Sequence, residues 1–379
     1  MKHHQFSFVQ ACIVAAGVLF LSSCNGDKDE PLSPADPSGS PSASGTANCY
    51  IVSAPGTYSF QTVKGNSNES VGNVASAVVL WESFGTSTSP SKGDIVKSVS
   101  YAAGSGSSAG TITYSTPSTL KNGNAVIAAK DNSGAILWSW HIWVCEGYNP
   151  ATTAQTYSNN AGTMMDRNLG ATSAEPGNVG ALGLLYQWGR KDPFLGSSSI
   201  SSSTQANSTL STWPSPVSSN SSTGTIAYAV AHPTTFIYGV SSTNYDWVYS
   251  SRDDELWQSA KTIYDPCPPG WKVPTGGSDG VWSKAANTSS SFSYTWNSTD
   301  KGMNFSNKFG SASTIWYPAA GYLGSGGGGL DSVGYYGTWW SCVPYGGYAY
   351  SLYLYYDGDV SPSSYSGRAI GHSVRCLQE

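Results

Sequence analysis

The side-chain types that most often carry catalysis are sparse in this chain of 379 residues. Beyond the first few residues the histidines are His141, His232 and His372, and no HExxH, CxxC or His/Cys cluster with zinc-ligand spacing occurs. The glycine-rich stretch 324–332 is not followed by the lysine of a phosphate-binding loop, so it predicts a flexible loop. We therefore expect no catalytic residues, no metal site and no cofactor.

The densest run of carboxylates is Asp253, Asp254 and Glu255, which follow Arg252. Such a run could supply acid–base catalysis or calcium ligands. A charged turn before Leu256 is the simpler interpretation, because charge runs usually form a solvated surface. An enzyme that uses these carboxylates is the third of three functional hypotheses, and we expect that the protein is not an enzyme.

The N-terminus predicts export and a lipid anchor. Lys2 precedes the apolar run 11–21, which is too short to span a bilayer comfortably and is typical of a secretory signal. The LSSC that ends at Cys24 resembles a bacterial lipobox, so residues 1–23 would be a lipoprotein signal peptide and Cys24 would carry the lipid. The following NGDKDE is similar to an acidic tag that sends lipoproteins of some Gram-negative commensals to the cell surface. We expect a protein anchored in the outer membrane.

Five cysteines lie beyond the anchor. Disulfides are permitted outside the cytoplasm, and Cys49 with Cys145 would join the two ends of one predicted domain. Cys267 could similarly reach Cys376 in the other domain. Cys342, beside two tryptophans, predicts a buried thiol rather than a reactive one. The pairing cannot be decided from spacing alone.

The composition separates a linker from folded segments. Residues 24–47 are rich in Pro, Ser, Asp and Gly and predict a flexible tether. Charged residues make up only 11% of the chain and the net charge is −5, so we do not expect a nucleic-acid partner. In residues 48–147, seven short β-like runs separated by turn-forming residues predict an immunoglobulin-like β-sandwich. His141 lies inside the apolar run WSWHIWV and is expected to be a core residue.

Residues 155–379 show a different pattern, in which Trp and Gly recur. We expect a helix around 179–193 and, overall, a mainly β chain with an α+β head. Residues 148–320 contain fifteen Lys, Glu, Gln or Met, whereas 321–376 contain none. In the run 349–360, Leu352 and Leu354 alternate with Tyr353 and other polar or aromatic residues, the pattern of a half-buried strand. We expect Tyr350, Leu352 and Leu354 to be packed, and Ser351, Tyr353 and Tyr355 to be displayed.

Several motifs together resemble one protein family. They are TMMDRNLGA (163–171), LLYQWGRKDPF (184–194), DPCPPGWKVP (265–274), TWWSC (338–342) and RAIGHSVRC (368–376). They are similar to those of bacterial surface lipoproteins with a C-terminal C-type lectin-like domain, whose position here is 155–379. In such domains a disulfide commonly ties the long loop region to the final strand, where Cys267 and Cys376 lie. The Glu-Pro-Asn, Gln-Pro-Asp and Trp-Asn-Asp motifs of calcium-dependent lectins are absent, so calcium-dependent glycan binding is not expected.

The segment 321–376 resembles the variable region of proteins that a diversity-generating retroelement rewrites. That process changes adenines in AAY-type codons and never yields Trp, Lys, Glu, Gln or Met at the rewritten positions. The resemblance implies a fixed frame that includes Trp340, Val374 and Cys376, with variable, ligand-binding residues between. The candidates for variable positions are Asp331, Ser332, Tyr335, Tyr336, Thr338, Tyr345, Gly346, Gly347, Ser351, Tyr353, Tyr355, Tyr356, Asp357, Asp359, Ser361, Ser363, Ser364, Tyr365, Ser366, Ile370 and His372.

Two functions remain as hypotheses. The first is a monomeric, receptor-like or adhesin-like surface lipoprotein whose C-terminal face binds a variable protein or glycan ligand through tyrosine contact area. The second is a fimbrial tip or pilus subunit, in which the sandwich exchanges a strand with its neighbour.

Overall fold

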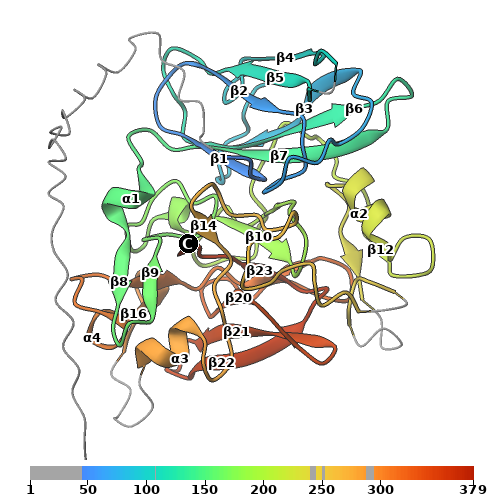
Figure 1. Cartoon of the computed structure of the whole chain (residues 1–379). Coiled ribbons are helices and arrows are strands. Elements are labelled where there is room, and N and C mark those ends of the chain that lie inside the picture. Colours follow the sequence, from blue (N-terminus) through green and yellow to red (C-terminus); the bar gives the residue numbers. More distant parts are fainter. Residues whose placement is uncertain (1–44, 107, 240–244, 250–251, 287–293) are drawn as a thin grey trace, which may run out of the picture. The chain divides into compact units, whose positions relative to one another are not determined.

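The computed structural model describes residues 45–106, 108–239, 245–249, 252–286 and 294–379 (Figure 1). The expected signal peptide, Cys24 and most of the expected tether lie outside these residues. Ala47, at the end of the expected tether, is fully buried in a hydrophobic core, so the packed part of the chain includes it. The described chain is mainly β, as the sequence predicts. No helix in the described ranges has the length and apolar character needed to cross a membrane.

The first seven strands of the described chain each lie in one of the seven β-like runs predicted from the sequence. They are β1 (Cys49–Val52), β2 (Thr57–Gln61), β3 (Ser76–Ser83), β4 (Ser98–Ala102), β5 (Thr111–Ser115), β6 (Gly123–Lys130) and β7 (Ile136–Val144). One sheet has the order β1-β7-β6-β3 and the other the order β2-β5-β4. Side chains from both sheets, among them Val52, Ile112, Ile127 and Trp140, share one core. His141 is buried as expected, and its Nε2 lies 2.8 Å from Asn124 Oδ1.

The expected disulfide between Cys49 and Cys145 is wrong. β1 pairs with β7 in parallel, and Cys49 lies opposite His141, four residues before Cys145. Four residues of a parallel strand span about 13 Å. A disulfide needs Cα atoms within about 7 Å of each other. Both cysteines are free and buried.

The helix expected around 179–193 is also wrong. A single 3-10 turn, η1 (Val179–Ala181), is followed by β10 (Leu184–Gln187). Gly183 between them has φ +71°, a left-handed conformation that ends helical geometry. A Cβ at this position would also lie 2.8 Å from the carbonyl oxygen of Leu169, so the site requires glycine.

The remaining strands form several small sheets and one large one. The strands before the C-terminal hairpins are β8 (Gln155–Tyr157), β9 (Gly162–Met164), β11 (Phe194–Leu195), β12 (Val217–Ser218), β13 (Ile237–Tyr238), β14 (Trp271–Lys272), β15 (Thr295–Asn297), β16 (Gly302–Asn304) and β17 (Trp316–Pro318). The helices are α1 (Pro150–Thr153), α2 (Ile226–Ala231), α3 (Val281–Ala286) and α4 (Ser306–Phe309). The last strands are β18 (Tyr322–Leu323), β19 (Leu330–Asp331), β20 (Tyr336–Tyr345), β21 (Tyr348–Tyr355), β22 (Val360–Gly367), β23 (Gly371–Ser373) and β24 (Leu377–Gln378).

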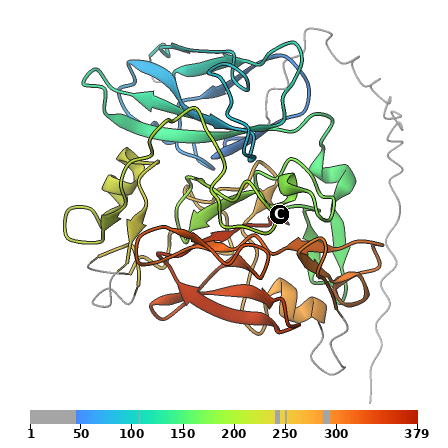
Figure 2. The same ribbon diagram turned by 180° about the vertical axis from the view of Figure 1, so that it is seen from behind.

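A continuous core joins the first seven strands to the rest of the described chain. One cluster of buried residues contains Trp81 and Trp143 together with Trp188 and Trp257. Polar groups also connect the two segments, since Asn48 Nδ2 donates to the carbonyl of Asp265 at 2.9 Å. The views of Figures 1 and 2 place β20, β21 and β22 on the side of the described chain opposite β2, β4 and β5.

The disulfide between Cys267 and Cys376 is present, in agreement with the resemblance. Cys342 is a buried free thiol, as its tryptophan neighbours predict.

Candidate functional site

β20, β21 and β22 form consecutive antiparallel hairpins at one edge of the large sheet, whose order is β11-β10-β23-β20-β21-β22. Leu352 and Leu354 of β21 are fully buried in a core with Trp339 and Tyr317. Tyr353 and Tyr355, on the other face of β21, are half-buried. The alternation expected from the sequence is therefore confirmed for these four side chains of β21.

The alternation fails at the other end of β21. Ser351 is buried rather than displayed, because it lies opposite Trp340, whose indole packs into the core and donates to the carbonyl of Tyr186 at 2.8 Å. Tyr350 is half-buried rather than packed, and its ring lies 4.9 Å from that of the exposed Tyr345. The hydrogen-bond register between β21 and β22 shifts between Ser351 and Tyr353, where this change of environment falls.

Four tyrosines of this region expose about half of their surface to solvent. The exposed fractions are 49% for Tyr335, 46% for Tyr345, 46% for Tyr356 and 52% for Tyr365. Only two other large hydrophobic side chains in the described ranges, Tyr245 and Tyr249, are exposed to a similar extent. We call the four tyrosines of β20–β22 and their turns the tyrosine face.

The rings of the tyrosine face contact further tyrosines. Tyr335 and Tyr355 both lie against Tyr356, with centroids 5.5 and 4.6 Å apart. Near the β20–β21 turn, Tyr365 contacts both Tyr345 and Tyr348, at 4.9 and 5.5 Å. Aromatic pairs at these distances hold each other's orientation, so the exposed rings form a preorganised surface.

The candidate variable residues divide into three groups by burial. The exposed ones are Asp331, Tyr335, Tyr345, Gly346, Tyr356, Asp357, Asp359 and Tyr365. The half-buried ones are Ser332, Tyr336, Tyr353, Tyr355, Ser361, Ser363, Ser364, Ser366 and Ile370. The buried ones are Thr338, Gly347, Ser351 and His372. Of these four, Ser351 is the one that the strand alternation expected to be displayed, and that expectation is wrong.

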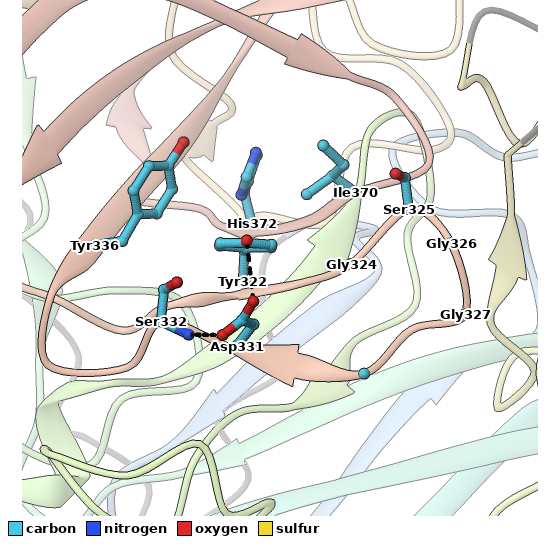
Figure 3. Close-up of a pocket in the computed structure, with 11 residues that line it drawn as sticks. Tyr322, Gly324, Ser325, Gly326, Gly327, Asp331, Ser332, Tyr336, Ile370 and His372 are labelled. Carbon is cyan, nitrogen blue, oxygen red and sulfur yellow. Dashed lines mark hydrogen bonds between the residues drawn. The ribbon is translucent and has the colours of Figure 1, made fainter. Parts of the chain in front are cut away.

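A pocket lies beside these strands, where the β18–β19 hairpin packs on β23 and the start of β20 (Figure 3). Its cavity volume is about 660 Å³. Five candidate variable residues line it, namely Asp331, Ser332, Tyr336, Ile370 and His372. The lining residues that sequence reasoning missed are Tyr322, Gly324, Ser325, Gly326, Gly327 and Gly329. The signal that could have found them is the glycine run itself, which is flanked by Tyr322 and Asp331 on strands that pair with each other.

His372 contributes to the base of this pocket, which we call the His372 pocket. Its side chain is only 1% exposed, and in the described part of the chain neither ring nitrogen has a hydrogen-bond partner. The close fit of β23 against β18 depends on Gly371, where a Cβ would lie 2.9 Å from the Cβ of Leu323. Burial lowers the pKa of His372 to about 3, so the ring is neutral near pH 7. A neutral imidazole offers one N–H donor and one nitrogen acceptor.

Asp331 and Tyr322 form the opposite wall of the His372 pocket. The Tyr322 hydroxyl donates to Asp331 Oδ2 at 3.2 Å, and the Ser332 amide donates to Asp331 Oδ1 at 2.6 Å. The ring of Tyr322 lies 5.2 Å from that of Tyr336. Burial raises the pKa of the Tyr322 phenol, so it keeps its proton near pH 7. Among the residues that the structure describes, Asp331 is the only charged side chain that lines the pocket.

The carboxylate run considered for catalysis has structural contacts. Asp254 pairs with the buried guanidinium of Arg368, and Asp253 Oδ1 accepts the amide N–H of Glu255 at 2.9 Å. Within the described ranges, no group of three or more His, Cys, Asp or Glu side chains is close enough together to hold a metal ion.

A GxSxG sequence is present at 276–280, where it precedes α3. A serine nucleophile in this pattern needs a histidine base within hydrogen-bond reach. In the described part of the chain, the ring of His141 contacts Asn124 and Trp143, that of His232 contacts Tyr228, and that of His372 contacts Trp340 and Tyr322. No recorded contact therefore joins Ser278 to a histidine.

Comparisons with protein-family models, with curated proteins and with solved structures find no match to this chain.

Proposed function

We propose that this protein is a lipid-anchored protein of the outer-membrane surface whose C-terminal face binds a protein ligand. The anchor is the lipid on Cys24, and the residues up to 44 hold the binding domain away from the membrane. Residues 48–147 act as an immunoglobulin-like sandwich stalk, and residues 155–379 as a C-type lectin-like head. The binding residues are those of the tyrosine face and its neighbours in 321–376.

One observation carries this proposal, the clustering of exposed aromatic side chains. All four residues of the tyrosine face fall within 335–365, and in the described ranges Tyr245 and Tyr249 are the only other large hydrophobic side chains that are exposed to a similar extent. Exposed aromatic groups in number are typical of interaction surfaces, and tyrosine supplies large contact area at low cost in conformational entropy. Removing one well-placed aromatic anchor typically weakens an interface by about 2 kcal/mol or more.

The burial pattern also supports a division of roles. Trp340, Val374 and Cys376 of the expected frame are buried, whereas eight candidate variable residues are exposed. Substitutions at exposed positions usually change stability by less than about 0.5 kcal/mol. A fixed core with replaceable surface residues would let ligand specificity change without loss of the fold.

The proposal is tested by sequencing the 3′ end of the gene in many sister clones and isolates. We expect codon changes at Tyr335, Tyr345, Tyr356 and Tyr365. Tyr317, a buried tyrosine outside the segment, serves as the internal control and should stay constant. Invariant or evenly scattered codons would overturn diversification and leave a fixed adhesin or a fimbrial subunit.

A further inference from the structure

We propose that the His372 pocket binds the guanidinium group of an arginine side chain presented by the ligand. This inference rests on the proposed function, because it takes the ligand to be a protein that contacts the C-terminal face. It specifies the chemical group of the ligand that the pocket binds. The residues that line the pocket are distinct from the four residues of the tyrosine face.

Charge is the first argument for a cation. The exposed charged side chains of 321–376 are Asp331, Asp357 and Asp359, all of them acidic. The two arginines of this segment, Arg368 and Arg375, are each 1% exposed and so offer no accessible positive charge. An acidic surface attracts a cationic group and repels phosphate or carboxylate.

The two buried arginines are held by groups inside the protein. Arg368 pairs with Asp254, and Arg375 donates to the carbonyl of Trp316 at 2.6 Å. Lys301, whose ammonium lies 5.9 Å from the centre of the Tyr335 ring, does not line the His372 pocket. None of the described residues therefore places a cationic side chain beside Asp331 in the lining of the pocket.

The hydrogen-bonding groups of the pocket are mostly acceptors. The Asp331 carboxylate receives one hydrogen bond on each oxygen, which leaves lone pairs on both. The Ser325 and Ser332 hydroxyls can accept, and so can one ring nitrogen of His372. A guanidinium carries five N–H donors and no acceptor, so it complements this set. The remaining N–H of His372 can donate to a backbone carbonyl of the ligand.

His372 gives the strongest single reason to expect a ligand here. A buried polar group without a hydrogen bond costs about 1–3 kcal/mol, so such groups in folded proteins usually have partners. The imidazole lines the cavity, and Figure 3 shows it projecting to the same side as Tyr336 and Ile370. A ligand in the cavity can supply the missing partner.

The aromatic walls favour arginine over lysine. The rings of Tyr322 and Tyr336 meet edge to face, at an interplanar angle of 69°. A planar guanidinium stacks on such rings while its N–H groups reach acceptors in its own plane, whereas an ammonium group is compact and more strongly hydrated.

The test uses the folded protein and a small probe, N-acetyl-arginine amide, with the neutral isostere N-acetyl-citrulline amide as its matched control. Binding is followed by the NMR signals of the His372 ring nitrogens and by titration. We expect the arginine probe to shift the His372 signals and to bind at least tenfold more tightly than the citrulline probe. N-acetyl-lysine amide should bind more weakly than the arginine probe.

Asp331→Asn should weaken binding of the arginine probe at least tenfold. Glu146→Gln, which removes an exposed carboxylate outside 321–376 that does not line the pocket, should leave it unchanged. Both side chains are on the surface, so both variants should fold. Equal binding of the arginine and citrulline probes would overturn the inference, and so would tighter binding of a methyl hexoside that is insensitive to Asp331→Asn.

The two proposals can fail separately. If codons vary across isolates but no arginine probe binds, the ligand-binding function stands and the arginine pocket is wrong. If the arginine probe binds but the codons are invariant, the pocket is a fixed site and diversification is wrong.

Discussion

The imidazole of His372 lies 4.5 Å from the indole of Trp340, measured between ring centroids. Trp340 is fully buried in the core shared with the first seven strands. A residue that lines the surface pocket is therefore also a neighbour of the core. Tyr365, in contrast, is exposed to solvent on β22.

We predict that His372→Tyr destabilises the protein by about 1–3 kcal/mol, because a larger ring must fit beside Trp340 in a closely packed site. Tyr365→His, the reverse exchange at an exposed position, should change the free energy of unfolding by less than about 0.5 kcal/mol. Urea unfolding of both variants measures the difference. An unchanged midpoint for His372→Tyr would show that the pocket, rather than the core, receives the new ring.

Stability should depend on pH through buried histidines. Burial lowers the pKa of both His141 and His372 to about 3, below the value of about 6.5 for an exposed histidine. As pH falls from about 6.5 towards 3, the unfolded chain takes up protons that the native chain does not, so these groups lower stability. Asp246 and Asp265 act in the opposite direction, because burial raises the pKa of each to about 6 and the native chain takes up their protons first.

A single variant isolates the histidine contribution. His141→Gln keeps a polar group beside Asn124 but cannot titrate. The free-energy difference between the wild type and this variant should shift in favour of the variant as the pH falls from 7 to 4. Urea unfolding at the two pH values checks this, and a constant difference would show that His141 is protonated alike in both states.

The thiol content gives a direct check of the cysteine assignments. A chain of residues 45–379, denatured without reductant, should react with a thiol reagent at three cysteines, namely Cys49, Cys145 and Cys342. After reduction it should react at five. The native protein should react slowly, because burial raises the pKa of each of these three thiols. One reactive thiol in the denatured, unreduced chain would mean that two of these three cysteines are paired, and Cys342 as the reactive one would identify the pair as Cys49 and Cys145.

Arg368 is predicted to stabilise the β20–β21 turn. Its guanidinium donates to the carbonyls of Tyr348 and Gly346, both at 3.1 Å, and lies over the ring of Trp188. We expect Arg368→Lys to cost about 2–5 kcal/mol, since an ammonium cannot reproduce these bonds or the stacking. Asp254→Asn, at the exposed partner, should cost about 1 kcal/mol or less. Equal effects in chemical unfolding would mean that the ion pair, and not the turn, carries the interaction.

The seven N-terminal strands could be predicted because each has its own apolar pattern between turn-forming residues. Their pairing could not, and the parallel register of β1 beside β7 is what separates Cys49 from Cys145. Register depends on which strands meet, and no local pattern encodes that. Strand alternation likewise predicted correctly that Leu352 is buried and that Tyr353 lies on the other face. It did not predict the burial of Ser351, which depends on Trp340 in a neighbouring strand.

The His372 pocket could not be predicted from the sequence either, because it also depends on which strands pair. Its two walls, the β18–β19 hairpin and β23, are about forty residues apart in the sequence and are brought together by the pairing of Leu323 with Gly371. The composition of 321–376 indicated a binding region, but only the sheet order decides which of its polar groups face a cavity. Among the described candidates that line the pocket, His372 is the one whose ring nitrogens lack a hydrogen-bond partner.

The position of β24 determines which altered copies of this protein could fold. β24 (Leu377–Gln378) pairs with β14 on one side and with β9 on the other, directly after the disulfide at Cys376. A copy with a frameshift or stop codon anywhere in 321–376 would lose both this strand and the cross-link. Such a copy would leave β14 without its partner strand and one edge of β9 unpaired, which would expose it to proteolysis. Folding would then select among altered copies. Copies with substitutions at exposed positions would fold, whereas truncated copies would not.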